Sequence, residues 1–129
     1  MWVESKKVAS CVYCGRLSKR HSLNHKTIVT ETGKTELVVS KHYCPYCNKH
    51  FTNPDGEKHA PLRRNVSWGL ILLALRLAEN MTLENACDEL RKQIGHELRP
   101  TTLHDWVMSK ERLLKRYEEV AKDYLEKEV

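Results

Sequence analysis

Two short cysteine motifs, Cys11-Val12-Tyr13-Cys14 and Cys44-Pro45-Tyr46-Cys47, organise this chain. Each motif is a turn that can present two thiolates to one metal ion, and the 29 residues between the motifs read as a β-hairpin that brings the turns together. Four thiolates at this spacing are typical of a closed, tetrahedral Zn²⁺ site that supports the fold and performs no chemistry. We therefore predict one structural Zn²⁺ bound by Cys11, Cys14, Cys44 and Cys47, with disulfides as the alternative.

Length and composition limit the size of the hydrophobic core. The chain has 129 residues, the size of one ordinary domain or two small ones, and 40% of its residues are hydrophobic with a single Phe. A folded unit below roughly 70 residues commonly needs a metal or a disulfide to stay stable. The composition therefore favours a metal-stabilised N-terminal unit followed by a helical unit.

The sequence has no segment typical of secretion or membrane insertion. Residues 1–7 lack the apolar stretch of a signal peptide, and the longest apolar run, residues 70–75, is too short to cross a bilayer. We predict a cytoplasmic, reducing location, where closely spaced cysteine pairs bind metal and stay unoxidised.

The net charge of +5 is unevenly distributed along the chain. Residues 1–60 carry ten Lys/Arg and five Asp/Glu, whereas residues 61–129 carry twelve of each. Within the second half, residues 91–116 hold seven basic and three acidic side chains. Basic charge gathered in two segments favours a polyanionic partner, and ordinary solvated surface charge is the alternative.

The segment between the cysteine motifs predicts a β-hairpin. Residues 26–30 and 35–40 are rich in β-branched side chains, and the Glu31-Thr32-Gly33-Lys34 turn joins them. Gly15, directly after Cys14, is suited to the positive φ that such a cysteine turn often needs. We expect Phe51 to pack under the metal site as a small core anchor.

Five histidines crowd the first half of the chain. Because four thiolates complete a tetrahedron, we predict that the histidines are surface or polyanion-contacting residues and not metal ligands. These residues are His21, His25, His42, His50 and His59.

The second half predicts helices that follow a turn-rich linker at residues 53–61. Pro61 is suited to the first turn of a strongly apolar helix over residues 62–79, which we expect to be the central core helix. Thr82 is the expected N-cap of a second helix over residues 83–94.

The end of that second helix and the start of the next follow from local signals. Gly95 is placed to end the second helix, and Cys87, alone on its apolar face, is expected to be a buried small hydrophobe. Pro100-Thr101-Thr102 opens a further helix, with one threonine as its cap. Since no Gly or Pro follows Pro100, we expect this helix to run on towards Lys127.

The order of these motifs resembles a known family. Cys-x₂-Cys-Gly, a hairpin, Cys-Pro-x-Cys and a nearby Phe resemble a zinc ribbon, and residues 81–86 with 101–107 resemble a transposase-type helix-turn-helix. Together they are similar to the N-terminal part of archaeal and bacterial insertion-sequence transposases and related transcription regulators. The connection over residues 95–99 is longer than the usual tight turn.

The resemblance implies an α+β fold in two parts. A small N-terminal zinc β-ribbon spans residues 1–60. An all-α helix-turn-helix domain with a long C-terminal helix follows at residues 61–129. The implied partner is double-stranded DNA.

In a helix-turn-helix the second helix enters the major groove by its N-terminal residues. Side chains that can bond to base edges stand there in this chain: Arg99, Thr101, Thr102 and His104. Three cations are expected on flanking phosphates: Arg91, Lys92 and Lys110. Five further cations are candidate DNA contacts at the start of the first helix and beside the first cysteine motif: Arg63, Arg64, Arg16, Lys19 and Arg20.

A heptad-like seam runs along the last helix through Trp106, Lys110, Leu113, Tyr117, Val120 and Tyr124. Pairing of two copies through Leu113, Tyr117, Val120 and Tyr124 would give a symmetric homodimer suited to a palindromic site. The alternative is packing against residues 62–79 of the same chain. We favour packing within the chain for residues 106–113 and the dimer for residues 117–124.

We therefore predict a sequence-specific double-stranded DNA-binding protein, acting at the nucleoid of a prokaryotic or viral host cell. It would be a transposase-type DNA-binding module or a transposase-derived transcription regulator. Alternatives are a fragment of a longer transposase and, less favoured, a rubredoxin-like iron protein for electron transfer. No enzymatic activity is expected, because no Ser/His/Asp, Walker or HExxH pattern occurs and no two-metal carboxylate set is recognised.

Overall fold

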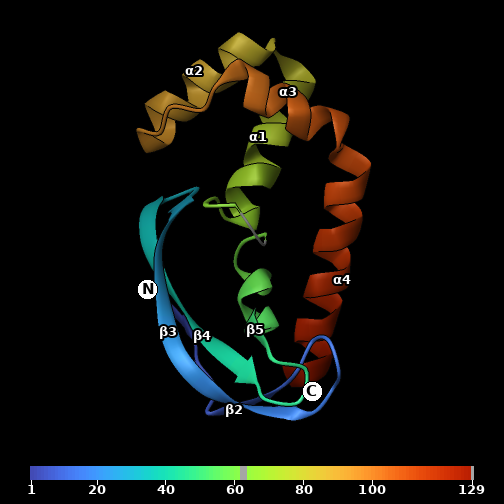
Figure 1. Cartoon of the computed structure of the whole chain (residues 1–129). Helices are drawn as coiled ribbons and strands as arrows, with labels where there is room; N and C mark the ends of the chain where they lie inside the picture. The colour runs from blue at the N-terminus through green and yellow to red at the C-terminus, as the bar shows by residue number, and fades with distance from the viewer. Residues whose placement is uncertain (62–63, 129) are drawn as a thin grey trace.

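The computed structural model describes residues 1–61 and 64–128, with side chains through Lys122. This part of the chain is α+β, as predicted: a mixed five-stranded sheet comes first and four α-helices follow (Figure 1). The strands are β1 (Trp2–Glu4), β2 (Val8–Ser10), β3 (Leu17–Thr30), β4 (Gly33–Cys44) and β5 (Lys49–Thr52). Their order is β1-β4-β3-β2, and β5 also pairs with β4. Among the described helices, none is both long and apolar enough to cross a membrane.

The β3–β4 hairpin is the longest pairing in the sheet and confirms the predicted strands. Thr30 pairs with Gly33 around a turn at Glu31-Thr32, and the Thr30 hydroxyl donates to the Gly33 carbonyl at 2.7 Å. Strand β3 begins well before the predicted segment, so the basic stretch after the first cysteine motif is part of it, whereas β4 runs into the second cysteine motif as expected. The turn lies beside the helices, and the other end of the hairpin carries the cysteines (Figure 1).

The expected linker at residues 53–61 is instead a packed element, so that prediction was wrong. Residues Pro54–Lys58 form a 3₁₀ helix, η1, capped by the Asn53 side chain. A Cβ on Gly56 would lie 2.8 Å from a methyl group of Val39, which shows how closely this segment covers the sheet. Apolar contacts explain this packing, because Ala60 is buried in one cluster with strand residues such as Ile28.

The first helix, α1 (Trp68–Asn80), begins later than predicted. Pro61 does not start it, and Val66 lies outside it, because this segment pairs with β3 before the helix begins. The Val29 N–H donates to the Asn65 carbonyl and the Ser67 N–H to the Val29 carbonyl, both at 2.9 Å. Ser67 then caps the helix by accepting from the Leu70 N–H. The end of α1 agrees with the prediction.

The second helix, α2 (Leu83–Ile94), has the predicted bounds. The Thr82 hydroxyl accepts from the Asn85 N–H at 3.2 Å, and Gly95 ends the helix with a φ of +70°. An αL residue after the last turn is a common helix stop, and Gly adopts it without a Cβ clash. These two local signals were sufficient to place both ends of the helix.

The third and fourth helices, α3 (Pro100–Met108) and α4 (Lys110–Glu128), correct two predictions. Helix α3 starts at Pro100 as expected, but Arg99 occupies the N-cap position without a side-chain bond, so neither threonine caps the helix. The single long helix is interrupted at Ser109, which has φ −101° and ψ 12°. The chain bends there, and α4 runs back alongside α1 toward the sheet (Figure 1).

The main core lies between the helices around α1. Cys87 is buried in it, as predicted, and each large apolar side chain removed from water contributes roughly 1.5–3 kcal/mol. The fully buried members of this cluster include Leu70, Ile71, Ala74, Leu90, Leu103 and Trp106.

The seam expected along the last helix mostly faces the chain's own core. Trp106 and Leu113 are buried there, which confirms packing within the chain for this part. Tyr117 is half-buried and lies against Trp68 with ring centroids 5.6 Å apart, so this residue also packs within the chain. The Tyr124 side chain lies outside the described residues, and the homodimer stays a prediction.

Candidate metal centre and nucleic-acid interface

The four predicted cysteine ligands converge at one end of the sheet. Their sulfur atoms all lie within 4.8 Å of one another, with Cys11 3.6 Å from Cys47 and Cys14 3.5 Å from Cys44. Tetrahedral bonds of 2.3 Å place sulfurs about 3.8 Å apart, whereas a disulfide needs about 2.05 Å. The cysteines are free, and their spacing fits one metal ion better than disulfides.

Local backbone geometry positions each pair of sulfurs. The residues after the second cysteine of each motif, Gly15 and Asn48, have positive φ angles of 79° and 58°. The prediction for Gly15 is thus confirmed, and Asn is among the few other residues that tolerate this conformation. Phe51 is buried beside Cys11 and Cys44, as expected of a core anchor under the site.

The protonation of the cluster is uneven. Burial raises the pKa of the Cys44 thiol, but hydrogen bonds from the Cys47 N–H and the Ser18 side chain outweigh it and lower the pKa to about 6. Burial and the neighbouring sulfurs of Cys44 and Cys11 raise the pKa of Cys47 to about 12. Adjacent thiolates repel each other, so a divalent cation would bind here with release of protons.

A buried histidine lies behind the cysteines, contrary to the prediction that all five are surface residues. His42 is 0% exposed and stacks on Phe51. Its Nε2 accepts from the Ser40 hydroxyl at 2.8 Å, and its Nδ1 donates to the Ser18 carbonyl at 3.3 Å. The Lys6 N–H in turn donates to the Ser40 hydroxyl, which completes a satisfied chain of hydrogen bonds. The period of two in β4 could have revealed this, since residues 40, 42 and 44 share one face.

The other histidines divide into exposed and half-buried residues. His21, His25 and His50 are exposed, as predicted. His59 is half-buried: it stacks on Trp2 with ring centroids 4.7 Å apart, and its Nε2 lies 2.8 Å from a Glu4 carboxylate oxygen. His59 thus attaches η1 to β1, a structural contact that its sequence neighbours did not indicate.

The candidate base-reading residues share the N-terminal turn of α3. Arg99, Thr101 and His104 are exposed there, whereas Thr102 is half-buried. Leu103 and Trp106 hold the opposite side of α3 in the core. Arg99 also lines a groove of about 450 Å³ between α2 and the 95–99 connection, together with Arg91, Asp88 and Glu97.

The candidate phosphate contacts near α3 are partly engaged with carboxylates. Arg91 lies 3.3 Å from Asp88 and 3.9 Å from Glu97, and Lys110 lies 2.6 Å from Glu79. Lys92 is exposed. Residues 82–108 carry five Asp/Glu and three Lys/Arg, so this end of the molecule is not cationic.

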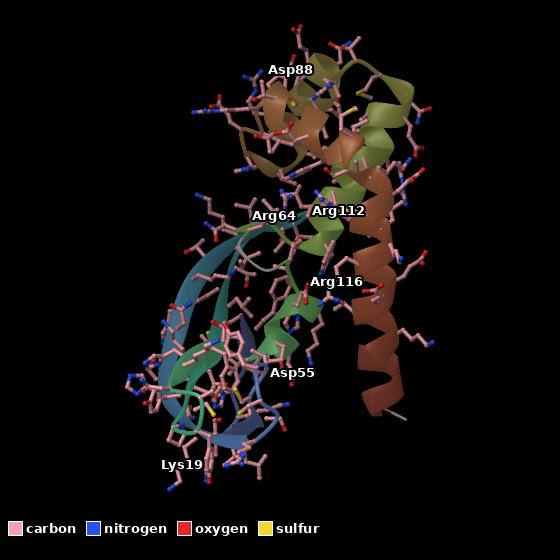
Figure 2. The ribbon with its side chains drawn as sticks, turned by 45° about the vertical axis from the view of Figure 1, so that its right-hand side comes forward. Lys19, Asp55, Arg64, Asp88, Arg112 and Arg116 are labelled. Atoms are coloured by element: carbon pink, nitrogen blue, oxygen red, sulfur yellow. The ribbon has the colours of Figure 1, made fainter. Side chains whose placement is uncertain are left out.

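The remaining candidate contacts lie elsewhere in the molecule. Arg16, Lys19 and Arg20 follow the first cysteine motif, and Figure 2 shows Lys19 and Asp88 at opposite ends of the molecule. Arg64 lies ahead of α1, where its carbonyl accepts from the Lys26 ammonium at 3.3 Å. Arg63 lies outside the described residues. The structure therefore separates Arg16, Lys19 and Arg20 from the candidate contacts around α3, with Arg64 between them (Figure 2).

An ion pair absent from the sequence predictions joins α4 to η1. The Arg116 guanidinium forms a two-pronged hydrogen-bonded pair with the Glu57 carboxylate, one bond of which measures 2.7 Å, and this pairing raises the pKa of Arg116 (Figure 2). The Trp68 indole N–H donates to the Glu57 carbonyl at 2.6 Å. Glu57 and Arg116 are 59 residues apart in the sequence, so no local sequence pattern could have predicted their contact.

Comparisons with known proteins found no matching family model, no matching curated protein and no matching solved structure. The resemblance to transposase DNA-binding regions therefore stays a prediction.

Proposed function

We propose that this chain is a sequence-specific double-stranded DNA-binding protein, built from a zinc ribbon over residues 1–60 and a helix-turn-helix over residues 61–129. The observation that carries the proposal is the arrangement of α3. Its Leu103 and Trp106 side chains are buried in the core, while Arg99, Thr101 and His104 are exposed in its first turn. A rigidly packed helix with an exposed polar N-terminal turn is suited to insertion into a major groove.

The metal has a structural role in this proposal. The cluster of Ala9, Cys11, Cys44 and Phe51 is too small to hold the cysteine end of the sheet together by burial alone. Four sulfurs at tetrahedral spacing fit Zn²⁺, which supplies the missing cross-link when bound. Iron fits the same ligands, so a zinc-loaded protein should lack visible absorption, whereas a rubredoxin-like protein would be coloured.

Two biological roles fit this design. One is the end-binding module of an insertion-sequence transposase, and the other is a transcription regulator derived from such a module. The proposal includes no catalytic residue.

Selection of bound duplexes from a random DNA pool by the zinc-loaded protein separates these roles. A palindrome would favour a dimeric regulator, and a consensus without dyad symmetry would favour recognition of element ends. Recovery of no consensus would contradict sequence-specific binding.

Point variants then test the recognition helix on the selected duplex. Arg99→Ala should weaken binding about tenfold or more, because a bidentate contact to guanine contributes roughly 1–3 kcal/mol. Arg76→Ala is the matched control, since Arg76 is an exposed arginine on α1 and is not part of the proposed recognition helix. Equal affinities of the two variants would show that α3 does not read the DNA.

A further inference from the structure

The two cysteine motifs repeat each other beyond the cysteines. In Cys11-Val12-Tyr13-Cys14-Gly15-Arg16 and Cys44-Pro45-Tyr46-Cys47-Asn48-Lys49, a tyrosine precedes the second cysteine and a cation stands two residues after it. The residue between that cysteine and the cation has a positive φ in both motifs. The repeat places two equivalent aromatic–cation sets around one cluster of sulfurs.

The cation of each motif lies over the tyrosine ring of the other motif. The Arg16 guanidinium lies 4.3 Å from the ring centroid of Tyr46, and the Lys49 ammonium lies 4.6 Å from the ring centroid of Tyr13. Cation–π contacts of this kind orient the rings. Tyr13 is nevertheless 58% exposed and Tyr46 is 64% exposed, so both rings stay accessible to a partner.

Each tyrosine also lines a groove. Tyr46 borders an opening of about 450 Å³ together with Lys19, Arg20 and His21. Tyr13 borders a second opening of about 400 Å³ that extends along the sheet to Asn24 and Lys26. Exposed rings and cations therefore line two grooves, one at the cysteine end and one that extends along the sheet away from it.

The chain segments that flank the cysteines are cationic, and one of their lysines, Lys6, is paired with Asp55 at 2.6 Å. Residues 5–30 carry six Lys/Arg and residues 37–54 carry two, and neither segment contains an Asp or Glu. A surface for duplex phosphates alone would need these cations but not exposed tyrosine rings. Base stacking on aromatic rings beside backbone-binding cations is how proteins bind unpaired nucleotides.

We propose that the cysteine end of the sheet is a binding site for single-stranded nucleic acid, in which Tyr13 and Tyr46 stack on unpaired bases while Arg16, Lys19, Arg20 and Lys49 contact phosphates. This site is separate from α3 and does not depend on duplex recognition there. The same cation–π pairs also link the two cysteine motifs, and substitution of the tyrosines separates this structural contribution from base stacking.

The test measures fluorescence anisotropy of the zinc-loaded full chain with short labelled oligothymidine, oligouridine and an abasic oligonucleotide of the same length. The abasic probe keeps the phosphates and lacks the bases. We expect oligothymidine or oligouridine to bind at least tenfold more tightly than the abasic probe, because each stacked base adds roughly fivefold or more. Equal affinity for the abasic probe would overturn the proposal.

Variants separate stacking from structural cross-linking. Tyr13→Leu/Tyr46→Leu should lower the oligothymidine affinity to that of the abasic probe, whereas Tyr13→Phe/Tyr46→Phe should keep it. Lys19→Ala should lower the affinities for oligothymidine and for the abasic probe by a similar factor, whereas Arg99→Ala should change neither affinity. A zinc content of one per chain in the leucine variant shows that the site is intact. If that zinc-loaded leucine variant binds oligothymidine as the unsubstituted protein does, the tyrosines are structural only and the proposal is wrong.

Discussion

The two ends of this molecule differ in both charge and the size of their apolar cores. At the helical end, α2 and α3 pack on a continuous apolar core, and residues 82–108 carry more carboxylates than cations. At the cysteine end, a small apolar cluster lies beside four free thiols, and the surrounding segments carry only cations. A rigid, weakly charged surface suits recognition by shape and hydrogen bonding, whereas a cationic, aromatic surface suits affinity for a flexible polyanion. The two ends are therefore expected to respond differently to the same perturbations.

The largest expected difference is the response to metal removal. Chelation of the proposed Zn²⁺ should unfold the cysteine end, since binding free energies of structural zinc sites reach about 10 kcal/mol or more. Hydrogen exchange should then show loss of protection in β3 and β4 near the cysteines, while α1 and α2 keep theirs. Zinc added back to the same sample is the control. Unchanged protection in β4 after chelation would show that no metal holds this end.

Acidification should also weaken metal binding at the cysteine end. Metal binding needs thiolates, and the raised pKa of Cys47, about 12, means that its proton must be displaced at neutral pH. For each proton that metal binding displaces, the affinity for zinc should fall about tenfold per unit decrease in pH. Cys44, with a pKa lowered to about 6, adds another proton to displace below that pH.

Titration of zinc against a competing chelator from pH 8 to pH 5 measures this dependence. The slope of affinity against pH should steepen below about pH 6. An affinity independent of pH would contradict thiolate ligation. The helical end, monitored by α-helical circular dichroism, is the internal reference.

A smaller effect is expected for the ion pair that joins α4 to η1. Arg116→Leu should lower the free energy of unfolding by about 2 kcal/mol, because it leaves the Glu57 carboxylate, 9% exposed, without its charged partner. Half of the Arg116 side chain is exposed, so the loss should be below that of a fully buried pair. Urea unfolding measures it.

Arg112→Leu is the matched control for that substitution. Arg112 is an exposed arginine one turn earlier on α4, where a hydrogen bond of 3.4 Å to the Ser109 hydroxyl is its described contact. Its loss should cost less than about 0.5 kcal/mol. Equal costs for the two substitutions would show that Arg116 does not join α4 to η1.

The smallest expected difference is in the salt dependence of binding. Arg91 is paired with carboxylates, so about two cations near α3 are available to phosphates. The logarithm of the binding constant for duplex DNA should therefore fall with the logarithm of the salt concentration at a slope of about −2. At the cysteine end, the four proposed phosphate contacts Arg16, Lys19, Arg20 and Lys49 are exposed. For oligothymidine they predict a slope of about −2.8. A steeper slope for the duplex would place duplex binding at the cysteine end.

Much of the candidate site could be predicted from short-range patterns. The convergence of the cysteines follows from their spacing, and the bounds of α2 follow from Thr82 and Gly95, because each signal involves residues within one turn of the element it defines. His42 was missed although strand alternation around Cys44 indicates its burial. The repeat of tyrosine and cation in the two motifs was also visible in the sequence.

Other features required contacts between distant residues. The helical pattern of residues 62–79 includes Val66, yet pairing of this segment with Val29 delays the start of α1 to Trp68. Turn-forming residues at 53–61 suggested an exposed linker, but apolar contact with the sheet buries that segment. The last helix bends at Ser109, where the sequence has neither Gly nor Pro. In the first two cases tertiary contacts overrode a reasonable local preference, and no local signal marks the bend.

Local chemistry in the sequence determined the cysteine cluster, the hairpin and the helix α2, because backbone turns, caps and strand propensities act between neighbours along the chain. The tertiary structure alone decided which charges are available to a partner. Lys110 and Arg116 count as cations in the sequence, but the fold pairs them with Glu79 and Glu57. It also placed Arg16 over Tyr46 and Lys49 over Tyr13. Coulomb and cation–π interactions depend on distance in space, and only folding brings these distant groups together.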